Sequence, residues 1–257
     1  MEQELLKIES SGARISAQIC RPHKGNSLSV ELLSELDTFT RQLCDGAFPD
    51  AKTVILSGAG DRAFSAGADI ASLAGLSASE ATNHMLWGQQ IFQRLEDAPQ
   101  VTIAAIAGVA YGGGLELAMA ADLRTATPQS RLGQPEITLA NIPGWAGTQR
   151  LPCLIGQGRA LQMILSGEPI SAELALEWGL LNVVADDALA AAHSLADIIE
   201  SRSATALHLA KDAVYAGQRL GTVHGSLVEA RHVGTCCTTP EQRAAVQGFL
   251  DRKKSKA

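Results

Sequence analysis

Aromatic residues and paired cysteines are what this sequence has least of. Phe, Trp and Tyr make up 4% of the 257 residues, so a hydrophobic core would have to consist of aliphatic side chains. The five cysteines are an odd number, show no Cys-x-x-Cys spacing and include the neighbours Cys236 and Cys237. This pattern argues against a disulfide framework and against a zinc site. It favours a reducing compartment, and we expect a cytoplasmic protein.

Positive charge and uninterrupted apolar runs are also scarce. Lysine and arginine number 21 against 27 aspartates and glutamates, which gives a formal net charge of -6. A nucleic-acid binder needs positive contacts to phosphates. Residues 101–121 are mostly apolar but contain Glu116 and three consecutive glycines, which disfavour a membrane span. We therefore expect neither a nucleic-acid partner nor a membrane span.

Aliphatic content and alternating patterns are what the chain does have. With 46% hydrophobic residues it can bury a core large enough to offset the entropy of ordering. Residues 13–20 alternate, and 52–57 and 101–106 are short apolar runs, so all three are predicted strands. Helical periodicity covers 29–44 and 78–97. Strands that alternate with helices are typical of an α/β fold with parallel pairing.

The pattern changes after about residue 145. From residue 156 onward nearly every segment is helical in pattern. The predicted helices cover 157–166, 171–178, 187–200, 204–217, 222–235 and 240–252. We therefore expect a βα core over residues 1–190, followed by a helical region over residues 191–257.

Cofactor and metal motifs are weak in this chain. Residues 58–63 have the G-x-G-x-x-A spacing of a dinucleotide-binding turn, but small, loop-like residues follow them where a helix would have to begin. The histidines are scattered, without a carboxylate or cysteine at ligand spacing. We expect no redox cofactor and no metal.

Two glycine-rich loops could present backbone amides to a ligand. The run from Gly112 to Glu116 follows a predicted strand and precedes a helical stretch over 115–121, which is the arrangement of an anion or oxyanion site. The small residues over 65–69 leave amides accessible in the same way. The alternatives are a tight strand-to-helix turn without a ligand and a plain turn capped by Asp69. If both loops converged on one carbonyl oxygen, they would form an oxyanion hole.

Two glutamates follow these glycines. Glu116 lies in the first turn of the predicted helix, where the helix dipole stabilises a carboxylate, and Glu136 follows Gln134 and Pro135. Two carboxylates in one pocket could perform general acid/base chemistry on one water, and at least one would have a raised pKa. The alternative is two solvated glutamates that never meet.

Three segments together resemble the crotonase (enoyl-CoA hydratase/isomerase) superfamily. They are F-S-A-G-A-D-I at 64–70, I-A-G-V-A-Y-G-G-G-L-E-L-A-M-A-A-D at 106–122 and G-Q-P-E-I-T-L-A-N-I-P-G-W-A-G-T-Q-R-L at 133–151. The resemblance spans nearly the whole chain. It implies an α/β fold, a spiral of ββα units with a helical C-terminal trimerisation region.

The resemblance also implies roles for individual residues. Ala68 and Gly113 match the positions whose amides form the oxyanion hole, and Glu116 and Glu136 match the catalytic glutamates. Phe249 and Arg252 match positions that reach the CoA of a neighbouring subunit. The positions expected to bind substrate or CoA are Asn26, Leu28, Ala66, Gly67, Asp69, Ile70, Gln134, Trp145, Phe249 and Arg252.

Three positions depart from the family pattern. Ala71 stands where lysine or another polar residue is common, which weakens an expected phosphate contact, and Val233 replaces a common aromatic. The family's Pro-Gly-x-Gly-Gly is here Pro-Gly-Trp-Ala-Gly, which places Trp145 where small residues are usual. We hypothesise that Trp145 lines the acyl end of the pocket and sets substrate shape; the alternative is a tryptophan in a subunit interface.

The implied activity is hydration of a 2-enoyl-CoA to a 3-hydroxyacyl-CoA, a lyase reaction of fatty-acid metabolism. Family members with one glutamate tend to isomerise double bonds, so two glutamates favour a hydratase. An isomerase, another CoA-thioester enzyme and a crotonase-like RNA-binding protein are the alternatives. We expect an acyl-CoA partner, no cofactor beyond the CoA of the substrate, and a homo-oligomer that is a trimer or a dimer of trimers. Acyl chain length and branching are left open.

Overall fold

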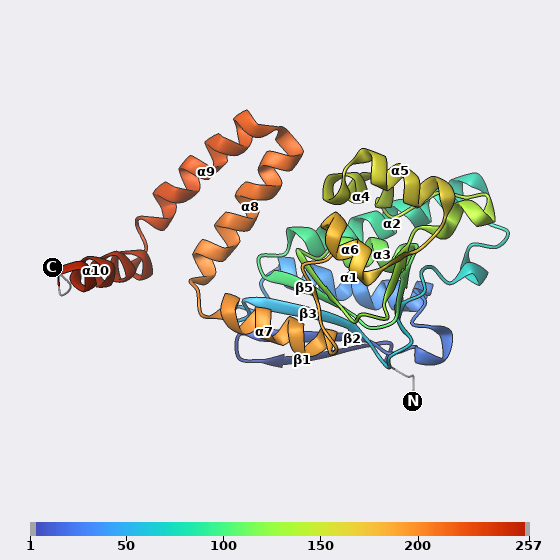
Figure 1. Cartoon of the computed structure of the whole chain (residues 1–257), viewed down its shortest axis with the longest axis horizontal. Helices are drawn as coiled ribbons and strands as arrows, with labels where there is room; N and C mark the ends of the chain where they lie inside the picture. The colour runs from blue at the N-terminus through green and yellow to red at the C-terminus, as the bar shows by residue number, and fades with distance from the viewer. Residues whose placement is uncertain (1–3, 255–257) are drawn as a thin grey trace. The chain divides into compact units, whose positions relative to one another are not determined.

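The computed structural model describes residues 4–254, which form two compact units (Figure 1). The first unit extends to Ile198 and the second begins at Ile199. The boundary that we expected after residue 190 lies inside helix α7 (Ala188–Glu200). The observed boundary between the two units lies in the same helix, near its C-terminal end. Both ends of the expected 1–257 division lie outside the described residues.

Two sheets organise the first unit. The larger has the order β1-β2-β3-β5-β7-β10, in which β1 pairs antiparallel with β2 and the other pairs are parallel. The smaller has the order β4-β6-β8-β9, with β9 antiparallel. The strands are β1 (Leu6–Ser11), β2 (Arg14–Ile19), β3 (Thr53–Gly58), β4 (Ala63–Ser65), β5 (Val101–Ile106), β6 (Val109–Tyr111), β7 (Leu123–Ala126), β8 (Arg131–Gly133), β9 (Ile170–Ser171) and β10 (Val183–Val184).

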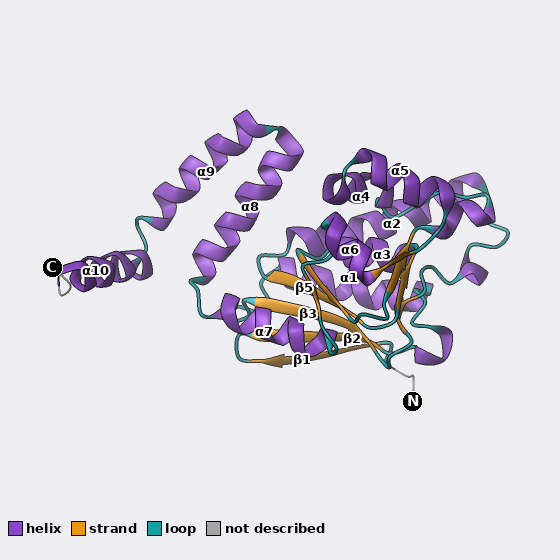
Figure 2. Ribbon diagram, in the orientation of Figure 1, coloured by secondary structure: helices purple, strands orange, loops and turns teal. Residues whose placement is uncertain are grey.

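Helices cover the sheets, and α1, α2 and α3 gather on one side of the larger one (Figure 2). The helices of the first unit are η1 (Pro22–Lys24), α1 (Val30–Cys44), η2 (Ile70–Ser72), α2 (Ala78–Asp97), α3 (Gly113–Met119), η3 (Pro135–Leu139), α4 (Gly147–Ile155), α5 (Gln157–Ser166), α6 (Ala172–Trp178) and α7. The α/β prediction is confirmed. The expectation of nearly continuous helix after residue 156 was too simple, because the short strands β9 and β10 interrupt it.

Side-chain caps explain where the long helices begin. The Ser29 hydroxyl accepts a hydrogen bond from the Leu32 amide at the start of α1. At the start of α2, Ser77 and Glu80 form a reciprocal capping box. Each cap satisfies amides that the first helical turn leaves unpaired. The predicted helices over 29–44 and 78–97 are therefore confirmed.

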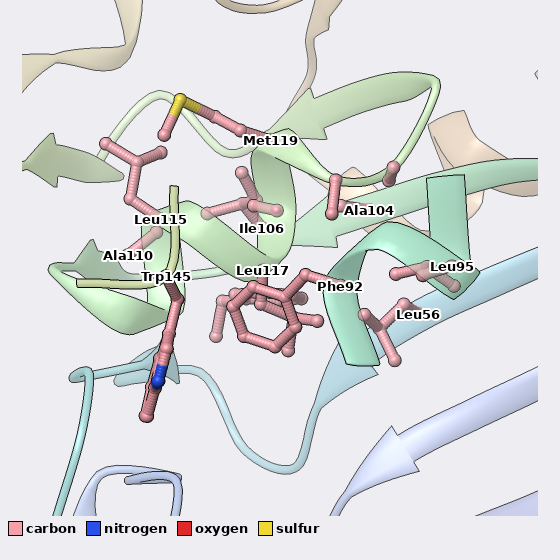
Figure 3. Packing of buried hydrophobic residues seen from close by; sticks show 14 of the residues in the cluster. Leu56, Phe92, Leu95, Ala104, Ile106, Ala110, Leu115, Leu117, Met119 and Trp145 are labelled. Carbon is pink, nitrogen blue, oxygen red and sulfur yellow. The ribbon is translucent and has the colours of Figure 1, made fainter. Parts of the chain in front are cut away.

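The core of the first unit is mainly aliphatic. Ile106 of β5, Leu117 of α3 and Phe92 of α2 pack together in it, and Trp145 lies beside them (Figure 3). Every residue of α3 is buried. In the described part of the chain, no helix combines the length and apolarity needed to cross a membrane.

The second unit consists of α8 (Ala204–Leu220), α9 (Thr222–Cys236) and α10 (Pro240–Lys254). Two glycines let α8 and α9 approach closely, because a Cβ on Gly225 would lie 2.5 Å from the Gly217 Cα. In α8, which is described in full, no side chain is buried, and in α9 Gly225 is the one buried residue. Within the second unit itself, these helices therefore leave much of their apolar surface uncovered.

Candidate active site

One cavity of about 270 Å³ collects most of the residues that the sequence motifs singled out. Its lining includes Ala66, Gly67, Ala68, Ile70, Gly113, Glu116, Glu136 and Trp145. These residues come from the loop after β4, from the start of α3, from η3 and from the loop before α4. The two glycine-rich loops and the two glutamates, which are far apart in the sequence, thus meet at one place.

The amides of Ala68 and Gly113 lie close together at this cavity. A Cβ built on Gly113 would be 3.4 Å from the Ala68 nitrogen, and one built on Gly67 would be 3.5 Å from the Gly113 nitrogen. Gly67 has a φ of +105°, a conformation that an L side chain rarely adopts. Within the described chain, neither amide is paired with a protein acceptor. The geometry can therefore present two donors to one carbonyl oxygen.

Glu116 is held by the backbone of a neighbouring loop. Its Oε1 accepts hydrogen bonds from the Trp145 amide at 2.8 Å and from the Gly147 amide at 2.6 Å. No hydrogen bond to its Oε2 is found in the described chain. Burial raises the pKa of Glu116 to about 7; the Gly147 and Trp145 amides oppose this rise, whereas the charge of Glu136 adds to it. Glu116 can therefore carry a proton at neutral pH.

Glu136 lies in a more open position. It occupies the first turn of η3 and is half-buried. Burial raises the pKa of this carboxyl as well. When the Gln134 amide nitrogen is turned toward it, that nitrogen donates to both carboxylate oxygens, at 2.9 and 3.2 Å. The expectation that at least one glutamate has a raised pKa is confirmed for both. The Gln134 amide is placed to orient the second carboxylate.

Three of the expected CoA-binding residues have structural contacts of their own. The buried Asn26 side chain donates to the carbonyls of Ala59 and Ala63 and accepts from the Arg21 amide. Leu28 is also buried, and its backbone bonds the segment around Ala68 on both sides.

Asp69 forms an ion pair with Arg21 at 3.1 Å. Asn26, Leu28 and Asp69 therefore shape the loop that carries the Ala68 amide. Contact between these residues and CoA stays a prediction.

Trp145 lies inside the first unit and not on its surface. It is 1% exposed, and its ring centroid is 5.5 Å from that of Phe92 and 5.9 Å from that of His84. A Cβ on Gly88 or on Gly113 would approach the indole to 2.3 Å. The alternative of a tryptophan packed into a subunit interface is therefore wrong, because the side chain is already buried within one chain. Trp145 lines the cavity, and its influence on the substrate stays a prediction.

Phe249 and Arg252 lie on α10 in the second unit, and both side chains are exposed. The ammonium of Lys253 lies 5.0 Å from the centre of the Phe249 ring. The contact of Phe249 and Arg252 with the CoA of a neighbouring subunit stays a prediction. In residues 4–254, no group of three or more His, Cys, Asp or Glu side chains is placed to hold a metal ion.

Sequence reasoning missed part of the cavity wall. Met85 of α2 and Ile142 of the loop before α4 line it, as does Gly144. A Cβ on Gly144 would lie 2.2 Å from the Met85 sulfur, so this glycine permits the loop to lie against α2. The glycine beside Pro143 was a usable signal of a close approach, but nothing local identifies Met85 as its partner.

Comparison with known proteins identifies the family of the chain. The family model described as enoyl-CoA hydratase/isomerase matches residues 9–256. The short-chain-enoyl-CoA hydratase of Clostridium acetobutylicum is 34% identical over 99% of this chain and 97% of its own, and the crotonyl-CoA hydratase of Syntrophomonas wolfei is 35% identical over 99% and 98%. The crystal structure of an enoyl-CoA hydratase from Bacillus anthracis superposes with a TM-score of 0.91 at 35% identity, covering 97% of each chain. The chain belongs to the enoyl-CoA hydratase/isomerase family.

Proposed function

We propose that this chain hydrates a 2-enoyl-CoA thioester to a 3-hydroxyacyl-CoA and is thus a hydro-lyase. The observation that carries this proposal is the meeting of two amide donors and two carboxyls of raised pKa in one cavity. The hydratases of Clostridium and Syntrophomonas support it as relatives.

The two amides would act on the thioester carbonyl. In the proposed complex, its oxygen accepts hydrogen bonds from Ala68 and Gly113. Negative charge grows on that oxygen as water attacks, so donors already in place stabilise the transition state more than the ground state. Withdrawal of electrons toward the oxygen makes the β-carbon electrophilic.

The two glutamates would move the protons. One carboxylate accepts a proton from water as the hydroxyl adds to the β-carbon, and the other carboxyl gives its proton to the α-carbon. The two glutamates therefore share one proton before and after the reaction, but the proton has moved from one glutamate to the other. Oε2 is the atom of Glu116 that can exchange a proton, because Oε1 already accepts two amide bonds. A pKa of about 7 suits a carboxyl that must both donate and accept a proton at neutral pH.

The surrounding residues would hold the CoA portion. Ala66, Gly67 and Ile70 line the cavity together with Ala68, and Asn26, Leu28 and Asp69 hold that loop through their own contacts. Gln134 would keep Glu136 oriented. The CoA belongs to the substrate, and the proposed reaction needs no other cofactor and no metal.

We also propose that the chain works as a homo-oligomer, a trimer or a dimer of trimers, in the cytoplasm. Apolar side chains on α8 and α9 are uncovered, with Val214 70% and Val223 75% exposed. An apolar groove of about 490 Å³ between these helices, lined by Leu209, Val214 and Val233 among others, offers a surface for a second copy.

The test is a panel of CoA esters with matched readouts. Loss of the conjugated enoyl-thioester absorbance follows hydration of crotonyl-, methyl-branched, aromatic and long-chain 2-enoyl-CoA. A 3-enoyl-CoA in the same panel tests double-bond isomerisation by the opposite change, because conjugation appears. Hydration of at least one ester supports the proposal. Isomerisation without hydration overturns it in favour of the isomerase alternative, and RNA binding that weakens across a salt series would favour the RNA-binding alternative.

A further inference from the structure

Side chains of helix α2 bind the loop before α4, and backbone amides of that region donate to Glu116. Gln89, Gln93 and Glu96 are spaced so that they lie on one face of α2, toward the loop before α4. The Gln89 side-chain nitrogen donates to the Gly144 carbonyl at 2.8 Å. The carbonyl of the next residue, Trp145, is held as well, by Arg150.

Arg150 is anchored on the same helix. Its Nε lies 2.9 Å from a carboxylate oxygen of Glu96, and its Nη2 donates to the Gln93 oxygen at 3.4 Å. Its Nη1 donates to the Trp145 carbonyl at 3.2 Å. The Arg150 and Glu96 side chains are only 9% and 11% exposed, so the ion pair is shielded from water and its geometry is well defined.

A single peptide group connects Gln89 to Glu116. The peptide bond between Gly144 and Trp145 is trans, so its carbonyl and its N–H point in opposite directions. The carbonyl accepts from Gln89, and the N–H donates to Glu116 Oε1 at 2.8 Å. Rotation of this peptide would break both bonds. Fixing the carbonyl therefore fixes the direction in which the amide donates.

We propose that Gln89 is a positioning residue for Glu116: it locks the Gly144–Trp145 peptide, with Arg150 and Glu96 holding the following carbonyl, so that Oε1 stays bound and Oε2 faces the cavity. This inference rests on the proposed function for its kinetic consequence. Its geometric content, that Gln89 sets the environment of Glu116 through a peptide, can be measured without substrate. Gln89 lies outside the recognised sequence motifs.

The charges around Glu116 make this inference testable by pH. Those that face it are Glu136 from η3 and Arg150 from α4. The other elements that pack most extensively on α3 are β4 and β6, in which Tyr111 is the one titratable residue. The Trp145 amide favours the ionised form of Glu116, so weakening that bond raises the pKa of this carboxyl.

The experiment compares Gln89→Met with Gln90→Met. Methionine keeps length and helix propensity but cannot donate, and Gln90 is the exposed neighbour on α2. For Gln89→Met we expect kcat for hydration to fall about 10- to 100-fold, as for a misplaced catalytic group, with KM unchanged and the alkaline limb of the kcat profile moved to higher pH. Gln90→Met leaves both as in the wild type.

A second readout needs no activity. The thermal midpoint is measured from pH 4 to pH 9. It should fall as the pH rises toward the pKa of Glu116, and in Gln89→Met this fall should continue to a higher pH, because the pKa of Glu116 is higher. If the wild type hydrates no ester, the proposed function fails, and this profile still decides the positioning role. Unchanged pH profiles overturn that role, even if the protein is less stable. If Gln89→Met does not fold, Gln89→Leu, which also lacks a donor for the Gly144 carbonyl and keeps helix propensity, is measured in the same way.

Discussion

The two compact units differ in how far they bury their apolar side chains. The first packs Phe92, Leu117 and Trp145 into a closed core and builds the cavity directly on it. The second exposes Val223, at 75%, and Leu227, at 56%, on α9. A core that is complete within one chain can hold catalytic groups in fixed positions, whereas exposed apolar helices gain stability only when another surface covers them. We therefore expect substitutions in the first unit to change chemistry and those in the second to change assembly.

Glu136→Gln should show most clearly that a substitution in the first unit changes the chemistry and not the assembly. The amide keeps the shape of the side chain but cannot transfer a proton, so we expect kcat on the best substrate to fall by about 10²- to 10⁴-fold with little change in KM. The oligomer, measured by light scattering, should be unaffected. A variant with nearly wild-type kcat would contradict the assignment of Glu136 as an acid/base.

Glu116→Gln should stabilise the first unit in alkaline solution while it lowers activity. Burial raises the pKa of this carboxyl from 4.5 to about 7, so the folded state favours the neutral acid. The stability contributed by that preference is complete below pH 4.5 and is lost as the pH rises through 7. At pH 8 the neutral amide should therefore be more stable than the wild type by about 3 kcal/mol.

Denaturant titrations of both proteins at pH 5 and pH 8 measure this difference. The gain should shrink at the lower pH, where the wild-type carboxyl is protonated. A gain of the same size at both pH values would show that the ionisation of Glu116 is not its cause.

Trp145→Phe should change substrate preference without leaving a large cavity in the core. Removing the whole indole would cost about 3–5 kcal/mol of stability, but phenylalanine keeps the contact with Phe92. The space gained should favour longer acyl chains, and we expect kcat/KM for longer enoyl-CoA esters relative to crotonyl-CoA to rise about tenfold. Oligomeric state should not change, because Trp145 is buried in its own unit. A flat chain-length profile would remove Trp145 from substrate selection.

Substitutions in the second unit should have the smallest effect on the protomer. Val223→Lys with Leu227→Lys places charge on an exposed apolar face of α9, and exposed substitutions usually change stability by less than about 0.5 kcal/mol per site. We expect sedimentation to show smaller species with native circular dichroism. An intact oligomer would mean that α9 lies outside the interface, and the contrast between the units would then need another explanation.

Local patterns were enough to predict much of the fold. The helices over 78–97 and 157–166 begin and end where the sequence indicated, since periodicity and caps are local properties. Helix α4 was missed because Gly147 begins it without a side-chain cap and Pro152 lies inside it. Strands β9 and β10 have two residues each, too few to show any period.

The site was predicted in part for the same reason. Glycine-rich loops and glutamates are visible in a sequence, and the structure brings Gly113, Glu116 and Glu136 to one cavity. The partners of Glu116 were not visible, because Trp145 and Gly147 act through backbone amides. Any residue type can supply a backbone amide, so only the tertiary fold identifies the one that does.

The contact between Gly88 and Trp145 limits the order in which these two positions can change during evolution. A side chain at position 88 has no room beside the indole, so a lineage can acquire Trp145 only once glycine is already present in α2. A glycine inside a helix costs about 0.5–1 kcal/mol relative to alanine, yet alanine has no room at position 88 while the tryptophan remains. Gly88 thus leaves the space that the Trp145 indole occupies, and we expect relatives with a side chain at this position to carry a small residue in place of Trp145.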